Sequence, residues 1–353
     1  MTAKALEARL FADRGVHALV DGQYGSTGKG ALAAWLAYQS TRQNLNFAGA
    51  ITSAGPNSGH TFYTEEGEKQ ILKQLPTFAV VACRYGFRTP AFLSAGSVID
   101  LKILTEEAER YPDVPIYVHG CAAVIQPGDS DRERSGSIGA IASTCSGTGI
   151  ALMRKIERKP DAIFKYYHAS SMLPSNVNIY WHLFEPDQHR YFLEVSQGYS
   201  LGINSWFYPH VTSRECTVMQ GIADARIAPR NVVKTYMSVR TYPIRVGDLD
   251  GHSSGDWYDD QVEVKWGDLN LMPELTTVTQ RVRRLATFSE GQFIEAMRVN
   301  DPDFVFINFL NYLSPAERLD FIAAIYDIRR DEATRKFNVL GGIGPKMEDI
   351  SFV

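Results

Sequence analysis

The chain has 353 residues, of which 44% are hydrophobic and 22% charged, so it is long enough to bury a large core. Its formal net charge of -4 argues against a nucleic-acid polymer as ligand, and no apolar run approaches the roughly 20 residues of a membrane span. The four cysteines show no metal or disulfide spacing, so we interpret them as buried free thiols. No apolar signal core is visible near Met1, and we expect a cytoplasmic location.

Apolar β-type runs alternate with helix-like stretches along the chain. The runs predicted as strands are residues 16–20, 47–53, 116–119, 192–195, 232–239, 304–309 and 337–340. The stretches predicted as helices are residues 31–37, 97–110, 212–225 and 314–330, and the last opens with the helix-start sequence Ser-Pro-Ala-Glu. This alternation predicts an α/β fold with a largely parallel central sheet flanked by helices. No segment is typical of a linker, so we expect a single domain over residues 1–353.

The turn after the first predicted strand, residues 22–30, reads Gly-Gln-Tyr-Gly-Ser-Thr-Gly-Lys-Gly. Backbone N–H groups at a helix start suit an anion, so this turn indicates a phosphate loop and a P-loop-like nucleotide-binding fold. It differs from the ordinary nucleotide-hydrolase loop, because Gln23 replaces its first glycine and Gly30 follows Lys29 in place of Ser or Thr. The hydroxyl that usually contacts Mg²⁺ is therefore missing from its usual position. A turn made only for packing is the alternative interpretation.

A second glycine-rich loop, residues 55–61, follows the next predicted strand and reads Gly-Pro-Asn-Ser-Gly-His-Thr. It places His60 directly behind Gly59 and Asn57 two residues before that glycine. An isolated histidine is usually structural. A histidine on a loop beside a phosphate loop can, however, polarise an oxygen that gains charge.

Together these loops resemble the hallmark loops of the adenylosuccinate synthetase family, Gly-x-x-Trp-Gly-Asp-Glu-Gly-Lys-Gly and Asn-Ala-Gly-His-Thr. Residues 141–149 look like the family's threonine loop, and residues 197–198 and 208–213 look like its other nucleotide-holding segments. The resemblance implies that a purine monophosphate is held by Ser26, Asn57, Ser143, Thr144, Arg158, Gln197 and Thr212. It also implies a homodimer in which Arg158 reaches the partner's site. Alone, Arg158 would be read as part of a solvated helix face.

Residues 276–284 resemble the family's aspartate loop, although Gln280 and Val282 depart from its pattern. The resemblance implies that L-aspartate is bound by Thr279, Gln280, Arg281 and Arg283. Guanidinium forks suit bidentate capture of a carboxylate. Taken alone, the cluster is equally compatible with a phosphate site or an exposed basic helix face.

Ser26 and Thr27 stand where family members that act on inosine monophosphate (IMP) carry an aspartate and a glutamate. That aspartate removes the N1 proton of the base while the histidine stabilises charge on O6, and a serine hydroxyl is no competent base at neutral pH. This departure resembles phage-encoded members that act on deoxyguanylate (dGMP) on the route to diaminopurine DNA, where a serine would leave room for the 2-amino group. The proton then leaves through Ser26 to phosphate or water, or to Asp21. A role for Asp21 as a cap of local N–H groups stays equally open.

Residues 308–311 read Asn-Phe-Leu-Asn where the family has Thr-Lys-Leu-Asp for the base of GTP. The amide of Asn311 offers one donor and one acceptor, which suits adenine and favours ATP or dATP as phosphate donor. Phe309 can stack on the base or belong to the core. Gly344 and Pro345 resemble the family's turn that closes over the same base.

The sequence therefore predicts a ligase that joins L-aspartate to dGMP with cleavage of ATP or dATP, through a 6-phosphoryl intermediate. Ser26, Lys29 and His60 are the predicted catalytic residues, and Mg²⁺ is expected to contact the Ser26 hydroxyl and the Gly59 carbonyl. The residues predicted to bind the triphosphate are Ser26, Thr27, Gly28, Lys29, Gly30, Gly59, His60, Thr61, Arg283, Asn308, Phe309, Asn311, Gly344 and Pro345. The alternatives are an ordinary adenylosuccinate synthetase that uses IMP and GTP, and an inactive nucleotide-binding regulator.

Overall fold

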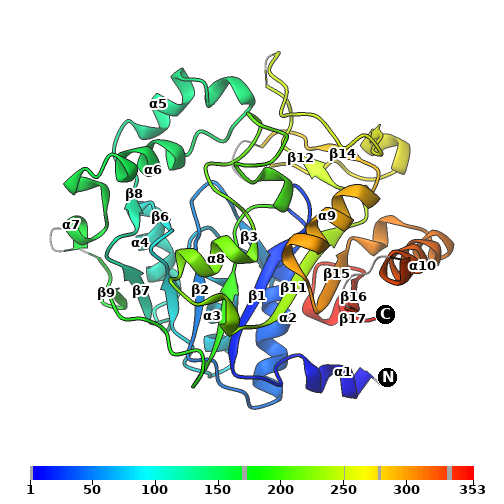
Figure 1. Cartoon of the computed structure of the whole chain (residues 1–353), viewed down its shortest axis with the longest axis horizontal. Coiled ribbons are helices and arrows are strands. Elements are labelled where there is room, and N and C mark those ends of the chain that lie inside the picture. The colour runs from blue at the N-terminus through cyan, green and yellow to red at the C-terminus, as the bar shows by residue number, and fades with distance from the viewer. Residues whose placement is uncertain (1–2, 169–172, 250, 277–279, 332–335) are drawn as a thin grey trace.

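The computed structural model describes residues 3–168, 173–249, 251–276, 280–331 and 336–353. At its centre is a ten-stranded sheet with the strand order β17-β16-β15-β11-β1-β10-β2-β5-β7-β9 (Figure 1). Among these strands, β17 is paired antiparallel and the other neighbours are parallel, which confirms the predicted α/β fold. The strands are β1 (Gly15–Asp21), β2 (Gly49–Thr52), β5 (Ala91–Leu93), β7 (Ile116–His119), β9 (Val177–Tyr180), β10 (Arg190–Glu194), β11 (Val232–Arg240), β15 (Phe304–Asn308), β16 (Asn338–Gly342) and β17 (Ile350–Phe352).

Helices cover both faces of this sheet, so its central strands are buried on both sides, as parallel strands usually are, while the edge strands β9 and β17 are partly exposed. β1 lies in the middle and every one of its residues is buried. Its side chains alternate between two cores, with Val16, Ala18 and Val20 in one and Leu19 in the other. The core that contains Leu19 packs under α2 (Lys29–Arg42), α3 (Thr77–Arg84) and α4 (Leu101–Arg110). The other core packs under α8 (Val218–Asp224), α9 (Glu290–Asn300) and α10 (Pro315–Asp331).

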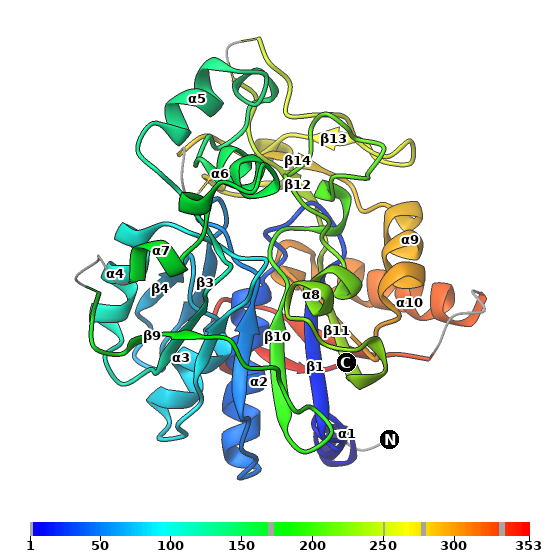
Figure 2. The same cartoon turned by 60° about the vertical axis from the view of Figure 1, so that its left-hand side comes forward.

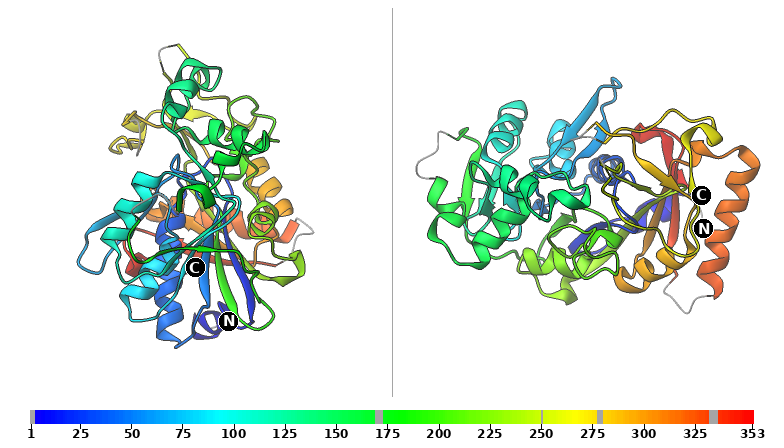
Figure 3. Two further views of the ribbon diagram at one scale, coloured as in Figure 1. Left: turned by 90° about the vertical axis from the view of Figure 1, so that its left-hand side faces the viewer. Right: turned by 90° about the horizontal axis from the view of Figure 1, so that it is seen from above.

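A second layer lies over the carboxyl ends of the parallel strands, above the upper edge of the sheet in Figure 2. It contains α5 (Asp129–Ser135), α6 (Thr148–Ile156) and a small sheet of β12 (Ile244–Arg245), β14 (Arg284–Ala286) and β13 (Glu263–Val264). Because loops at the carboxyl ends of open parallel sheets form ligand sites, this layer encloses the place where a site is expected. The right-hand view of Figure 3 shows α7 (Lys165–His168) and α10 toward opposite ends of the molecule.

The remaining elements are short. They are α1 (Ala3–Arg9), the hairpin β3 (His60–Tyr63) and β4 (Lys69–Leu72), the pair β6 (Val98–Ile99) and β8 (Ala123–Val124), and the 3-10 helices η1 (Gly139–Ile141), η2 (Pro160–Ala162), η3 (Tyr199–Leu201), η4 (Pro229–Asn231), η5 (Trp266–Leu269), η6 (Leu310–Tyr312) and η7 (Met347–Asp349). None of the helices in the described part of the chain is both long and apolar enough to cross a membrane.

The predicted strands all exist, with ends shifted by a few residues, but two predicted helices begin later than expected. Asp100 and Thr217 explain the shift, because each caps its helix by accepting a backbone N–H one turn ahead. The strands β5, β9 and β17 and the helices α3, α5 and α9 are among the elements that were not predicted. β5 is too short to show a period, and α3 is apolar around most of its circumference and so lacks a helical pattern.

One expectation about the cysteines is wrong in part. All four are free thiols, but only Cys216 is fully buried, and Cys83, Cys121 and Cys145 are partly exposed. Burial raises the pKa of the Cys216 thiol to about 12, so it stays protonated at neutral pH.

Candidate functional site

Two cavities meet at the carboxyl end of β1. The first has a volume of about 180 Å³ and the second about 490 Å³. Ser26, Lys29, Gly59, His60 and Arg283 line both of them. The three residues predicted to be catalytic therefore lie together at the junction of the two cavities.

Nearly all the other predicted binding residues lie around one cavity or the other. Asn57, Ser143, Thr144, Gln197 and Thr212 line the first cavity. Thr27, Gly28, Gly30, Thr61, Asn308, Phe309, Asn311, Gly344 and Pro345 line the second. The structure thus separates the residues predicted for a monophosphate from those predicted for a triphosphate.

The phosphate loop connects β1 directly to the first turn of α2. At two of its positions, a side chain larger than that of glycine would clash with neighbouring residues. Gly28 has a φ of 96°, and a Cβ on it would lie 1.9 Å from the side-chain nitrogen of Asn308. A Cβ on Gly30 would lie 2.4 Å from the carbonyl oxygen of Thr61. A serine or threonine therefore does not fit after Lys29, which explains the departure from the ordinary loop.

Ser26 is the exposed residue of this loop and has a left-handed backbone with φ 55°. Its neighbour Thr27 is fully buried, and the Thr27 hydroxyl contacts Asp21 and Ser238. Of the two adjacent residues that depart from the family pattern, only Ser26 therefore exposes its side chain at the cavities.

Asp21 ends β1, and its carboxylate is buried and surrounded by donors. Oδ1 accepts the backbone N–H groups of Gln23 at 2.9 Å and Gly25 at 3.2 Å. Oδ2 accepts the Thr27 hydroxyl at 2.5 Å and the Lys29 ammonium at 3.0 Å. Asp21 does not belong to the lining of either cavity in the described structure. Of its two interpretations, the geometry favours a cap that shapes the loop over a proton acceptor.

His60 begins β3 and is held by a residue that the sequence analysis missed. Its Nδ1 lies 3.2 Å from Oε2 of Glu194, a carboxylate with no exposed surface. Oε1 of Glu194 accepts the backbone N–H of Phe78 at 2.8 Å. Nε2 of His60 has no hydrogen-bond partner among the residues that the structure describes. The ring is thus anchored through one nitrogen and leaves the other for a ligand.

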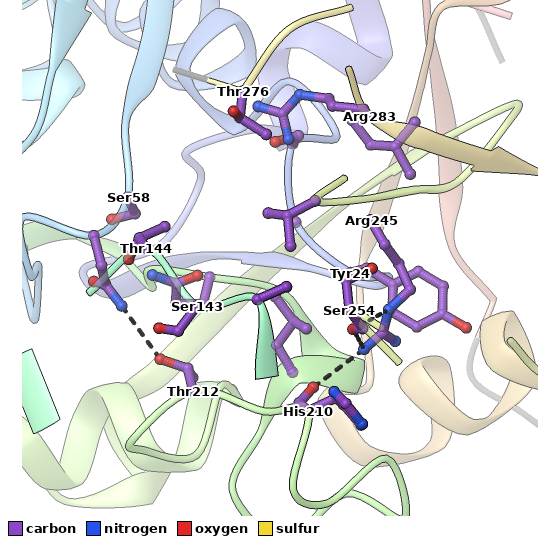
Figure 4. A pocket seen from close by; sticks show the side chains of 18 of the residues that line it. Tyr24, Ser58, Ser143, Thr144, His210, Thr212, Arg245, Ser254, Thr276 and Arg283 are labelled. Carbon is purple, nitrogen blue, oxygen red and sulfur yellow. Dashed lines mark hydrogen bonds between the residues drawn. The ribbon is translucent and has the colours of Figure 1, made fainter. Parts of the chain in front are cut away.

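Side chains with hydroxyl and amide groups line one part of the first cavity. The side-chain amide of Asn57 donates to the Thr212 hydroxyl at 3.4 Å, with Ser143 and Thr144 close by (Figure 4). Arg158, by contrast, follows the C-terminus of α6 and is exposed, and it does not line the cavity within the described residues of its own chain. The seven residues predicted to hold the monophosphate are thus brought together except for Arg158.

A buried arginine also faces the first cavity, and the sequence analysis did not find it. The Arg245 guanidinium donates to the carbonyl oxygens of Ser254 and His210 and lies against the rings of Tyr24 and Phe207 (Figure 4). Burial lowers the pKa of Arg245 to about 10, so the group keeps its charge at neutral pH. It ties the phosphate loop, the loop before Thr212 and the segment after β12 together.

The arginine segment, residues 280–284, lies across the cavity from Thr212. Arg283 lines both cavities, and burial lowers its pKa to about 10 against the opposing effect of Glu274. Arg281 donates to the carbonyl oxygens of Gly247 at 3.0 Å and Ala142 at 3.1 Å, so it joins this segment to the threonine loop. Within the described structure, neither Gln280 nor Arg281 lines a cavity. Thr279, also predicted to bind aspartate, lies outside the described residues.

Phe309 and Asn311 lie at the second cavity, just beyond β15. Phe309 has a left-handed backbone with φ 60° and is only partly buried, so it is not a core residue. The Arg240 guanidinium lies 3.9 Å from the centre of its ring. Asn311 is exposed at the cavity, as a group that reads a base must be.

The oxygen atoms at the junction suit a hard cation. Ser26 and Gly59 line both cavities and offer a hydroxyl and a carbonyl oxygen. No cluster of three His, Cys, Asp or Glu side chains able to hold a metal occurs in the described part of the chain. This donor set fits Mg²⁺, which keeps several waters and binds largely through phosphate oxygens, and does not fit a zinc centre.

Comparisons with known proteins agree on one family. The profile of the family described as adenylosuccinate synthetase matches residues 161–348. N6-succino-2-amino-2'-deoxyadenylate synthase of Vibrio phage phiVC8 is 34% identical over 96% of this chain and 98% of that protein. The enzyme of the same name from Cyanophage S-2L is 36% identical over 94% of this chain and 91% of that protein.

Among solved structures, one supports the same family and a second shows the same fold. The succinoaminodeoxyadenylate synthetase of Cyanophage S-2L, bound to dGMP and to dATP as an energy donor, superposes with a TM-score of 0.83 at 33% identity, covering 96% of this chain and 95% of that one. Fully ligated adenylosuccinate synthetase from Plasmodium falciparum has a TM-score of 0.75 at 17% identity, covering 97% and 100%, and shares the fold.

Proposed function

Because the chain belongs to the adenylosuccinate synthetase family and is therefore a ligase that forms a C–N bond, we propose that it acts as a single domain that joins L-aspartate to dGMP. ATP or dATP is cleaved, and the products are 2-amino-2'-deoxy-N6-succinyladenylate, the nucleoside diphosphate and phosphate. The observation that carries this proposal is Ser26, which stands at the junction of the two cavities where IMP-dependent members have an aspartate. The relatives whose names specify a 2-amino-2'-deoxy product match nearly the whole chain.

The first step brings dGMP from the first cavity and the triphosphate from the second to their junction. O6 of the base attacks the γ-phosphorus, the new O6–P bond forms, and the bond to the bridging oxygen of the leaving diphosphate breaks. Nε2 of His60 stabilises the charge that O6 gains. Lys29 and the N–H groups of the phosphate loop stabilise the transferring phosphoryl group.

The N1 proton of the base has to leave in this step. Both oxygens of Asp21 are occupied by donors, and the carboxylate is shielded from the cavities, which argues against Asp21 as the acceptor. Ser26 is the exposed group at the junction. Its hydroxyl passes the proton to a phosphate oxygen or to water, because a serine relays a proton more readily than it keeps one.

The second step takes place in the first cavity. The amine of aspartate attacks C6, the C–N bond forms, and the 6-phosphoryl group leaves as phosphate and takes up the amine proton. Arg283 lines both cavities and holds the aspartate carboxylate or the departing phosphate through its guanidinium fork. Gln280, Arg281 and Thr279 remain predictions for the same substrate.

The Ser26 hydroxyl and the Gly59 carbonyl would hold Mg²⁺, which would offset the negative charge of the phosphates. The nearby Asn311 amide matches the donor and acceptor edge of adenine, and the partly exposed ring of Phe309, which lines the second cavity, stacks on that base in this proposal.

A homodimer completes the first cavity in this proposal. Arg158 is exposed and lies outside its own chain's cavity. The helix that precedes it, α6, exposes the apolar residues Met153 and Ile156, and the loop before Thr212 exposes Trp206 and Tyr208. Exposed apolar side chains around a site are typical of a subunit interface. Arg158 then enters the partner's cavity and binds the 5'-phosphate of dGMP.

The proposal is tested by comparing two substrate sets with the purified enzyme and Mg²⁺. One set contains dGMP, ATP and L-aspartate, and the other contains IMP, GTP and L-aspartate. Aspartate-dependent phosphate release and the mass of the product are measured for each. We expect a higher kcat/KM for the first set. A higher value for the second identifies an ordinary adenylosuccinate synthetase, and tight nucleotide binding without aspartate-dependent phosphate release identifies the inactive regulator.

A further inference from the structure

Arg240 is the largest fully buried side chain of the described structure, and it lies outside both cavities. It ends β11, between β1 and β15 in the sheet. Its main chain is bound twice by Gln23 of the phosphate loop. The Arg240 N–H donates to the Gln23 side-chain oxygen at 2.9 Å, and the Gln23 amide donates to the Arg240 carbonyl at 3.1 Å. This arginine is therefore fixed relative to the phosphate loop.

The Arg240 guanidinium contacts three segments of the chain: the phosphate loop, the turn after β15 and the segment that precedes Arg283. It donates to the carbonyl oxygen of Ser26 at 3.1 Å and lies 3.9 Å from the ring centre of Phe309. It also forms a two-pronged ion pair with Glu274, through Nη1 to Oε2 at 3.2 Å and Nη2 to Oε1 at 2.5 Å. A buried charge with these contacts fixes its neighbours' relative positions.

Glu274 carries this contact to the arginine segment. Its carbonyl oxygen accepts the backbone N–H of Arg283 at 2.9 Å, and Oε1 also accepts the Tyr312 hydroxyl at 2.8 Å. Glu274 and Tyr312 both line the second cavity. Burial opposes ionisation of Glu274, but Arg240, with smaller contributions from Tyr312 and Arg283, outweighs burial and lowers the pKa of the carboxyl, so the pair is charged at neutral pH.

We propose that Arg240 and Glu274 are positioning residues that couple binding of the triphosphate's base to binding of aspartate. A base that stacks on Phe309 restrains the ring that Arg240 contacts. The ion pair transmits that restraint to Glu274, and the main-chain hydrogen bond of Glu274 transmits it to Arg283. By reciprocity, aspartate held by Arg283 strengthens binding of the triphosphate. This inference rests on the proposed function of the two cavities.

The coupling is measured as the change in affinity for a non-hydrolysable ATP analogue when aspartate is added in the presence of dGMP and Mg²⁺. For the wild type we expect aspartate to increase the affinity for the analogue about 10-fold, which is within the usual range for linked sites. In Glu274→Gln we expect this factor to fall to about 1, and KM for both ATP and aspartate to rise about 10-fold, with a smaller change in kcat.

A second variant separates positioning from stability, because Glu274→Gln leaves Arg240 buried without its counter-ion. In the double variant Arg240→Met and Glu274→Leu the charge is gone, and replacing a buried ion pair by apolar residues is often neutral for stability. We expect its thermal stability to recover toward the wild type while both KM values stay raised. Recovery of both KM values together with stability contradicts the proposal, as does a rise in KM for one substrate alone.

Glu263→Gln is the matched control. Glu263 forms a similar two-pronged ion pair with Arg284 on the small sheet, at 2.8 and 2.6 Å, and lines neither cavity in the described structure. We expect wild-type coupling in this variant. Binding of the analogue needs no turnover, so a failure of the coupling and a failure of the proposed reaction are seen in separate measurements. Wild-type affinity that does not respond to aspartate overturns the inference even when dGMP is turned over.

Discussion

The two cavities that meet at the phosphate loop are built in different ways. The second cavity is formed largely by segments that leave the ends of β1, β15 and β16, and its volume of about 490 Å³ lies within the range of preformed ligand sites. The first cavity is enclosed by loops around Thr144, Thr212 and Val246, and its volume of about 180 Å³ lies below that range. We call the proposed triphosphate side, which the sheet forms, the sheet-built side. The proposed monophosphate side is enclosed by loops and is completed by a second chain in our proposal, and we call it the loop-built side.

The two sides also differ in which buried polar groups have hydrogen-bond partners. At the second cavity, the terminal nitrogens of Arg240 donate to Glu274, which also accepts the Tyr312 hydroxyl, while Nε of Arg240 has no partner within the described residues. At the first, Nε2 of Gln197 and Nη1 of Arg245 have none. Gln197 and Arg245 line the first cavity, whereas Arg240 lies outside both cavities. An unpartnered buried polar group costs free energy, which a substrate that bonds to Gln197 or Arg245 recovers. The loop-built side therefore keeps donors that a substrate can reach, whereas the ion pair of Arg240 and Glu274 fixes the geometry of the sheet-built side.

The largest effect that we expect comes from His60, where the two sides meet. His60→Ala removes the group that we propose to stabilise charge on O6, and it should lower kcat about 100- to 1000-fold, as loss of one charge-stabilising donor does elsewhere. KM for dGMP and ATP should change little. Steady-state kinetics on both substrates measures this. A large rise in KM for dGMP or for ATP with unchanged kcat would mean that His60 only helps to bind that substrate.

Arg158 tests whether the first cavity is completed by a second chain. Arg158→Ala should lower kcat/KM for dGMP about 100-fold, because a guanidinium bound to a phosphate is lost, and should leave KM for ATP nearly unchanged. Mixing this variant with His60→Ala should restore activity, since half of the mixed dimers' sites then contain both residues. Each variant alone is the control. Mixtures no more active than the sum of their components would contradict a shared site.

The sequence predicted the sheet-built side more completely than the loop-built side. Buried strands have a clear apolar pattern, and residues just after them, such as Asn308 and the phosphate loop, must gather at one edge of a parallel sheet. Arg245 instead takes part through contacts between loops whose paths no local pattern determines. Glu194 and Arg240 could have been found, because each is a charged residue at the end of an apolar strand.

The roles of individual residues were less predictable than their places. Asp21 had two open interpretations, and only its four donors in the folded chain favour the cap. Phe309 could have been a core residue or a ring that stacks on the base, and its left-handed backbone and partial exposure agree with a place at the cavity. The donors to Asp21 are local, but which of them it accepts is decided only by the folded turn. The contact of Phe309 with Arg240 comes from a distant strand, which the local sequence does not contain.

Glu194 offers a milder change at the junction than removal of His60. Glu194→Gln keeps the shape of the side chain but takes away the carboxylate charge that faces Nδ1 of His60. Residues that orient a catalytic group typically contribute 10- to 100-fold, and we expect kcat to fall about 10-fold with little change in either KM. In the background of His60→Ala the substitution should have almost no further effect. Additive losses in the double variant would show that Glu194 acts independently of His60.

Asn311 tests the sheet-built side by itself. Asn311→Asp replaces an amide donor by a second acceptor, which opposes adenine N1 and favours the paired donors of guanine. We expect kcat/KM for ATP to fall about 10-fold and that for GTP to rise, as removal of one matched hydrogen bond in a base site does. KM for dGMP should not change. The ratio of the two triphosphates' kcat/KM values, measured at fixed dGMP and aspartate, reports the result.

The smallest effect concerns acid stability of the ion pair at the sheet-built side. The folded-state pKa of Glu274 is lowered, so the pair stabilises the fold above the ordinary carboxyl pKa of about 4.5, and this stability is lost as pH falls below it through the folded-state pKa. The difference in unfolding free energy between the wild type and Glu274→Gln should therefore be greatest near neutral pH and shrink in acid. Urea unfolding at several pH values measures it. A difference that stays constant with pH would mean that Glu274 stabilises the fold by shape and hydrogen bonding without its charge, and the contrast between a charge-fixed second cavity and a loop-built first cavity would then lose its electrostatic basis.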